Sequence, residues 1–491
     1  MSRNNRRLRL AFAGLLAFSH SFAGAQRPPA TGARAALGTG VIAVRHAAVI
    51  PMTRDTVLRD ATVIVRDGRI VAVGPTASTA VPSSAQVIDA TGKYLIPGLS
   101  DMHVHLLSDG EEVHDSAGPA ELGVMLANGV TVARLMIGTP EQLTLRGDVS
   151  AGRVLGPQLW VASPQLTGRA SENALVVTAP SEAREAVRRA ADAGYDFIKV
   201  TLFITPEVYD AIIDEAKVRG IRVVGHVEPA VGVRRALAAG EQIEHLDSYL
   251  EAVLADSAPM RTALTQGLVF QARNWVSMDY VDERKIPEIA GATARAGVFV
   301  DPTQNVFNTA FAIGESDSVI RNRSDWQFWP PKMRQGYLNA HRTYWDPARW
   351  VERTEARRRR YVDVRNKLVK AIVDSGGKIM SGSDTPEWFH MYGWGLHREL
   401  QALVRAGLTP YQALEAATKH PAEFLRASAE WGSIERGKRA DFILLSANPL
   451  DDIRNTELIE GVAMGGRWMN RRQLDAMISR GVNAVRVGTP N

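Results

Sequence analysis

The chain has 491 residues, a formal net charge of +5 and no cysteine. The lack of cysteine excludes disulfide bonds, thiolate nucleophiles and thiolate metal sites, so nitrogen and oxygen atoms would have to hold any metal. A hydrophobic fraction of 45% in a chain of this length allows a large core, such as a barrel of ~250 residues with a smaller domain.

Residues 1–25 have the pattern of a secretory signal peptide, with four Arg before an apolar run from Leu10 to Phe18 and then Ala23-Gly24-Ala25 as a cleavage site. The run is far shorter than the ~20 residues of a spanning helix. We therefore expect export to the periplasm or the medium, with no membrane anchor after cleavage. Because the segment contains four Arg and no acidic residue, its removal lowers the net charge from +5 to +1, which gives no support for nucleic-acid binding.

The segment that follows predicts a flexible lead-in over residues 26–39, which are rich in Pro, Gly and Ala. From 40 to 96 the chain shows short alternating segments broken by Asp67-Gly68 and Gly74-Pro75, a pattern typical of antiparallel strands joined by hairpin turns. These residues predict the first part of a small β domain.

Between residues 97 and 428 the chain alternates strands and helices, which predicts a parallel sheet. The expected strands are 99–105, 130–136, 157–163, 196–202, 221–226, 241–246, 297–302 and 377–383. Eight such strands favour an α/β fold of the (β/α)8 TIM barrel type, and a doubly wound sheet stays open on the pattern alone. Polar residues at the carboxyl ends of the strands favour the barrel.

A long insertion is expected at about 303–365, between the seventh and eighth strands, and it holds four Trp. It predicts either a helical layer packed on the barrel or a lid that shapes a substrate pocket. Residues 429–475 return to β character, and we expect them to pair with residues 40–96. Both chain ends would then build one β-sandwich-like domain, with 476–491 as a C-terminal tail.

The chemistry is concentrated at the expected strand ends. His103 and His105 are two residues apart at the end of the first strand, so both side chains point to the same face and can bind one ion. Four further polar residues interrupt apolar runs at the ends of later strands; they are Lys199, His226, His245 and Asp384. Buried charge of this kind is costly unless it is paired or metal-bound.

Longer motifs accompany these residues, and they are Pro97 to His105, Ala406 to Pro410, Gly432 to Asp441 and Asn448 to Ile453. On these residues the chain resembles the amidohydrolase superfamily, and within it the imidazolonepropionase-like and Xaa-Pro dipeptidase (prolidase)-like branch. The resemblance implies two divalent metal ions and a carboxylated Lys199 that bridges them. The ligands it implies are His103, His105 and Asp384 for one ion, and His226 and His245 for the other.

The implied chemistry is hydrolysis by a metal-bridged hydroxide, with Asp384 as general acid and base. A free ammonium cannot bind a cation, but a lysine amine that has reacted with CO2 offers two carbamate oxygens. Zinc is the metal that this ligand set favours, and Mn or Co also fits.

The substrate class implied by the resemblance is a small amide, either a dipeptide or an N-acyl amino acid. A lactonase, carbamate hydrolase or deaminase with the same site stays open, as does a homo-oligomer. A non-catalytic binding protein is disfavoured, because all six ligands are present. His114, Tyr249 and Arg273 are candidates to bind a substrate carboxylate. The branch commonly has H-A-H or H-A-Y at the end of the fifth strand, whereas this chain has His226-Val227-Glu228. A side chain that would orient the substrate is therefore missing or replaced.

Overall fold

The computed structural model describes residues 37–106, 114–115, 118–170, 174–259, 272–386 and 390–487. The predicted signal peptide lies outside these residues. Within them, no helix combines the length and the apolar character needed to cross a membrane.

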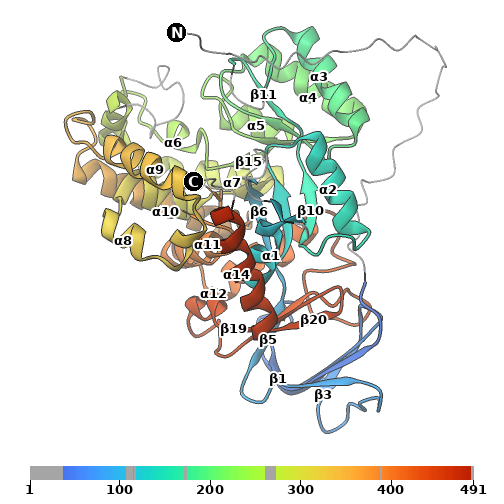
Figure 1. The fold of residues 1–491 in the computed structure, drawn as a ribbon. Coiled ribbons are helices and arrows are strands. Elements are labelled where there is room, and N and C mark those ends of the chain that lie inside the picture. The colour runs from blue at the N-terminus through green and yellow to red at the C-terminus, as the bar shows by residue number, and fades with distance from the viewer. Residues whose placement is uncertain are drawn as a thin grey trace, which may run out of the picture. The chain divides into compact units, whose positions relative to one another are not determined.

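Eight parallel strands form the barrel (Figure 1). They are β6 (Leu99–Val104), β9 (Val130–Leu135), β10 (Gln158–Val161), β13 (Phe197–Val200), β14 (Arg222–Gly225), β15 (Gln242–Glu244), β16 (Phe299–Asp301) and β17 (Lys378–Ile379). Two arcs, β10-β9-β6 and β13-β14-β15-β16-β17, are joined by the parallel bridges Val104↔Thr385 and Ala162↔Phe197. The predicted barrel is therefore confirmed.

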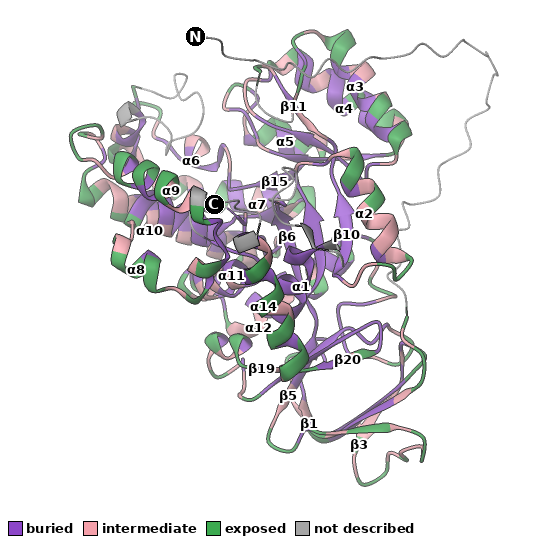
Figure 2. Cartoon of the chain, in the orientation of Figure 1, coloured by how far each residue is buried: buried purple, intermediate pink, exposed green. Residues whose placement is uncertain are grey.

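The barrel strands are buried on both faces, as every residue of β6 and β9 shows (Figure 2). Parallel strands that are covered on both sides read as nearly continuous apolar runs, and this is why the charged residues among them stand out in the sequence. Two short strands, β11 (Gln165–Thr167) and β12 (Ala174–Val176), extend the second arc beside β13. A further pair is formed by β7 (His114–Asp115) and β8 (Gly118–Pro119).

Helices follow most strands, and their boundaries have local causes. The helix α4 begins after Thr205, whose hydroxyl accepts from the Val208 N–H, and it ends at Gly220 with a positive φ of 64°. The helices of the barrel region are α1 (Ala120–Ala127), α2 (Pro140–Ser150), α3 (Pro180–Ala193), α4 (Pro206–Arg219), α5 (Val233–Ala239), α6 (Tyr249–Ala252), α7 (Ile286–Ala296), α10 (Glu355–Asp374), α11 (Trp394–Arg405), α12 (Pro410–Ala417) and α13 (Lys419–Phe424). Short 3₁₀ helices lie at Ala272–Tyr280 and Glu283–Lys285.

The insertion forms a helical layer. It contains a π-helix, η4 (Val306–Ile313), α8 (Asp317–Asn322), the 3₁₀ helix η5 (Ser324–Phe328) and α9 (Pro331–Tyr344), and it leads into α10. Trp329 is fully buried, and Trp326, Trp345 and Trp350 pack against the main core. The insertion is therefore helical and packs on the core, while its role as a layer or as a lid stays a prediction.

The small domain is one sheet with the order β20-β19-β18-β5-β1-β2-β3, and β4 lies beside β1. Its strands are β1 (Val41–Val49), β2 (Leu58–Arg66), β3 (Arg69–Pro75), β4 (Gln86–Asp89), β5 (Tyr94–Pro97), β18 (Phe442–Leu445), β19 (Ile459–Met464) and β20 (Arg467–Asn470). Antiparallel pairing of β18 with β5, in which Phe442 faces Pro97, joins the two chain ends as predicted.

Side chains alternate across this sheet, as the two-residue period of a strand requires. Leu95 and Phe442 pack in the domain's own core, whereas Ile96 and Ile443 belong to the core that includes the barrel. The 3₁₀ helix η6 (Ile453–Glu457) connects β18 to β19. Beyond β20, the helix α14 (Arg471–Val487) packs on α1 and occupies most of the stretch that was predicted as a C-terminal tail.

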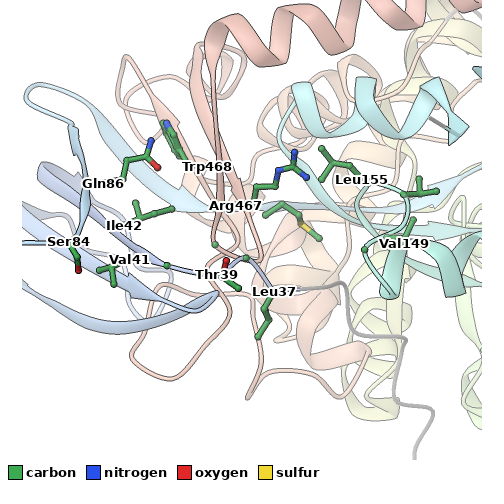
Figure 3. Close-up of a pocket in the computed structure, with 17 residues that line it drawn as sticks. Leu37, Thr39, Val41, Ile42, Ser84, Gln86, Val149, Leu155, Arg467 and Trp468 are labelled. Carbon is green, nitrogen blue, oxygen red and sulfur yellow. The ribbon is translucent and has the colours of Figure 1, made fainter. Parts of the chain in front are cut away.

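A cavity of about 660 Å³ opens between the sheet of the small domain and the end of α2 (Figure 3). Ile42, Gln86 and Trp468 line it from the sheet, and Val149 and Leu155 line it from the barrel side. None of the six predicted ligands lines it.

Candidate metal centre

The barrel brings the predicted ligands to one end. His103 lies in β6 and Lys199 in β13, while His226, His245 and Asp384 follow β14, β15 and β17. The ring centroids of His103 and His245 are 4.7 Å apart, and those of His226 and His245 are 4.6 Å apart. Because the strands are parallel and adjacent, residues distant in sequence meet where the strands end.

Three of these residues form a compact set of possible ligands. Candidate donor atoms of His103, His105 and Asp384 all lie within 4.8 Å of one another. His105 Nε2 lies 3.2 Å from Asp384 Oδ1, and His103 Nε2 lies 3.4 Å from the same oxygen. Two imidazoles and a carboxylate suit zinc and similar divalent ions.

The second nitrogen of three imidazole rings is held by an acceptor. His103 donates from Nδ1 to Glu244 Oε2 at 2.7 Å, and His226 donates from Nδ1 to Asp247 Oδ2 at 2.7 Å. His245 Nδ1 lies 2.7 Å from Thr303 Oγ1, and that hydroxyl donates to the Pro302 carbonyl, so His245 is the donor. Each ring therefore keeps the Nε2 lone pair free, which is the arrangement that metal-binding histidines show.

Lys199 is the least usual member of the group. Its side chain is 1% exposed, and Nζ has no hydrogen-bond partner among the described residues. Burial lowers the pKa of Lys199 below its ordinary value, although Glu244 and Asp384 oppose this effect. A buried amine with a lowered pKa and no partner fits a lysine that serves a metal site better than one that forms an ion pair.

The charge states of the other residues also suit cation binding. Burial holds the pKa values of His103 and His245 well below the ordinary range, so both rings are neutral and can bind a metal. Burial alone would raise the pKa of Asp384, but the hydrogen bond from His105 and nearby positive charge outweigh it and hold that pKa at about 2. The site thus combines neutral imidazoles with an ionised carboxylate.

The Amidohydrolase family matches this chain over residues 94–469. The chain belongs to this family. Among curated relatives it is similar to a dihydroorotase of Carboxydothermus hydrogenoformans, with 28% identity over 39% of this chain and 55% of the relative. It is also similar to an imidazolonepropionase of Cupriavidus necator, with 26% identity over 43% of this chain and 64% of the relative. The chain thus spans less than two thirds of either.

Solved structures extend the likeness to most of this amidohydrolase. A putative prolidase from Bifidobacterium longum is 25% identical, with a TM-score of 0.62 over 90% of this chain and 98% of that one. A bottromycin amidohydrolase shares the fold, with 24% identity and a TM-score of 0.69 over 91% of this chain and 90% of that one. The predicted family resemblance is confirmed.

Sequence reasoning missed the residues that support the candidate ligands of this amidohydrolase. Glu244 holds His103, and Asp101 accepts from the Ser383 N–H at 2.9 Å and from its hydroxyl at 2.6 Å. Desolvation raises the pKa of Asp101 to about 7, although these hydrogen bonds oppose the shift. A carboxylate inside an otherwise buried strand was the available signal, since Asp101 lies in β6 and Glu244 in β15.

One substrate-contact prediction was wrong. Tyr249 is fully buried, and its hydroxyl donates to Thr293 Oγ1 at 2.8 Å, so it is engaged in the core beside α7. Thr293 in turn donates to the Ile289 carbonyl within that helix. The side chains of His114 and Arg273 lie outside the described part of the chain.

Proposed function

We propose that this amidohydrolase is an exported, metal-dependent enzyme that cleaves the amide bond of a dipeptide or an N-acyl amino acid. The observation that carries the proposal is the unpartnered buried amine of Lys199, which lies with four histidines and Asp384 at the ends of the barrel strands. The amide class is supported by the likeness to the putative prolidase and to a structure described as a Xaa-Pro dipeptidase.

The residues present fit a binuclear centre. His103, His105 and Asp384 would hold one ion, His226 and His245 the other, and a carboxylated Lys199 would bridge them. His105 Nδ1 has no partner among the described residues, so this ring can change tautomer when a cation replaces the proton that it shares with Asp384. Bound divalent ions would acidify a water molecule and polarise the substrate carbonyl.

The chain's own groups position the site and move the proton. Asp384 is ionised, so its carboxylate can accept a proton from the attacking water and deliver it to the leaving amine. Thr303 and Asp247 fix the rings of His245 and His226 through their Nδ1 atoms. Since all of these partners are in place without substrate, little reorganisation is needed when a substrate binds.

The first experiment is metal content per chain in wild type, Lys199→Ala and Lys217→Ala, where Lys217 is an exposed control on α4. We expect about two metals in wild type and in the control, and a clear loss in Lys199→Ala. A parallel panel of dipeptides, N-acyl amino acids, lactones, carbamates and aminopurines separates the amidase from the other hydrolases. If Lys199→Ala holds as much metal per chain as wild type, the bridging role of Lys199 is refuted.

Export has its own test. The intact mass of the protein recovered from the periplasm or the medium should correspond to a chain that begins at Gln26. Recovery of the uncleaved chain in the cytoplasm alone would refute the signal peptide.

A further inference from the structure

A buried carboxylate links three strands beneath the metal centre. Glu244 ends β15 with no exposed surface, and its Oε2 accepts from His103 Nδ1 of β6 at 2.7 Å. Its other oxygen accepts from Arg134 Nη2 of β9 at 2.6 Å. Both oxygens are thus engaged, one by a candidate metal ligand and one by a guanidinium.

The guanidinium is itself fixed on several sides. Arg134 donates from Nε to the Met102 carbonyl at 2.5 Å and from Nη1 to Gln242 Oε1 at 2.5 Å. Its Cζ lies 5.8 Å from the ring centroid of Phe197 and 5.4 Å from that of Phe424, and these two rings stack on each other. A buried ion pair of this kind contributes little net stability compared with well-packed apolar residues, so its place against His103 points to a role in the site.

We infer that Glu244, held in place by Arg134, is a positioning residue that fixes His103 and makes the His103, His105 and Asp384 position the tighter of the two metal positions. The inference rests on the proposed metal centre and deepens it. A hydrogen bond to a buried carboxylate makes an imidazole a stronger metal ligand and fixes its tautomer and orientation. Loss of such a partner typically weakens metal binding by about 10- to 100-fold.

The other position has a hydroxyl partner and a carboxylate partner that is partly exposed. His245 is held by the neutral hydroxyl of Thr303, and His226 is held by Asp247, whose side chain is 20% exposed. Solvent near Asp247 weakens its hydrogen bond to the ring, whereas the hydrogen bond from His103 to Glu244 is shielded from water, with Arg134 fixing the carboxylate from its other side. The two positions should therefore differ in affinity, and they should respond to different substitutions.

The test is zinc titration of the metal-free protein against a chromophoric chelator, with wild type, Glu244→Gln, Asp247→Asn and Asp441→Asn side by side. Gln cannot replace Glu244, because its single oxygen can accept from only one of two facing donors. We expect Glu244→Gln to weaken binding of the more tightly bound zinc ion by about 10- to 100-fold. We expect Asp247→Asn to weaken binding of the other zinc ion. Asp441 is paired with Arg439 in the small domain, so Asp441→Asn controls for the loss of a buried charge.

The outcomes separate the two proposals. Wild type that binds no zinc would refute the proposed function. Wild type that binds two zinc ions while Glu244→Gln keeps the affinity for the more tightly bound ion unchanged would overturn the positioning role. If Glu244→Gln fails to fold by circular dichroism, the double variant Arg134→Met/Glu244→Gln removes the competing donor and lets the amide oxygen face His103. Its affinity for the more tightly bound ion should then be lower than that of wild type, and equal affinity would refute the role of the charge.

Discussion

At the scale of single residues, candidates for the chemistry could be picked out of the sequence, whereas their partners could not. A charged residue inside an apolar run is visible without a structure, and this signal found Lys199 and Asp384. The same signal is present at Arg134 and Glu244, but these residues are 110 positions apart in the chain and their contact depends on barrel closure. Pairing across the barrel interior is a tertiary property, so the sequence alone could not assign it.

Burial of Glu241 gives a pH-dependent stability. Glu241 is fully buried, Tyr209 donates to it at 2.8 Å, and burial raises its pKa to about 8. The folded protein thus keeps a proton that the unfolded chain releases above its ordinary pKa of 4.5, so this stabilisation is complete at low pH and is lost as the pH rises towards 8. Each pH unit between the two values corresponds to about 1.4 kcal/mol.

Glu241→Gln removes this titration and keeps the shape of the side chain. We expect the melting temperature of the variant to rise relative to wild type between pH 5 and pH 8, by roughly 1 °C for each kcal/mol in a chain of this length. Calorimetry at several pH values measures the difference, and Glu141→Gln on the surface of α2 is the control. A difference that stays constant with pH would show that Glu241 is already ionised in the folded protein.

At the scale of elements, the spacing of apolar residues and the turn-forming residues in the sequence predict most of the strands and helices. The helix α4 spans Pro206–Arg219, and the residues that mark its ends, Thr205 and Gly220, can be recognised in the sequence. The helix α14 was missed, although Leu474, Met477, Ile478 and Val482 have helical spacing. Its most extensive contacts are with α1, more than 300 residues earlier, and the sequence alone could not show that this distant helix covers its apolar side.

Close packing of α14 on α1 depends on Gly481. A Cβ at this position would lie 2.5 Å from Val124 Cγ2, whereas a Cβ at Gly336 in α9 would meet no atom within 4 Å. Replacing Gly by Ala inside a helix gains about 0.5–1 kcal/mol when space is available. Gly336→Ala should therefore raise the melting temperature, and Gly481→Ala should lower it, with a net cost of about 1–3 kcal/mol from overpacking. Thermal unfolding measures the melting temperatures of both variants. A higher melting temperature for both would contradict the close contact between α14 and α1.

At the scale of the whole molecule, the metal centre and the small domain both join distant parts of the chain. The predicted pairing of the two chain ends is confirmed by β5 and β18, and the predicted barrel closes through bridges at Thr385 and Ala162. The sequence could not show that one face of the small sheet shares a core with the barrel. That contact, through Ile96 and Ile443, predicts that the two parts unfold together.

Metal removal should therefore destabilise the entire chain. The proposed ligands come from five of the eight barrel strands, so bound ions hold together strands as short as β17, which spans two residues. Binding to the folded state alone stabilises it by about 2.7 kcal/mol when the free metal is 100 times its dissociation constant. We expect a chelator to shift one calorimetric transition of the protein to lower temperature. The shift should be much smaller in Lys199→Ala, which lacks the bridging ligand. Two transitions, of which only one responds to the chelator, would show instead that the small domain unfolds independently of the barrel.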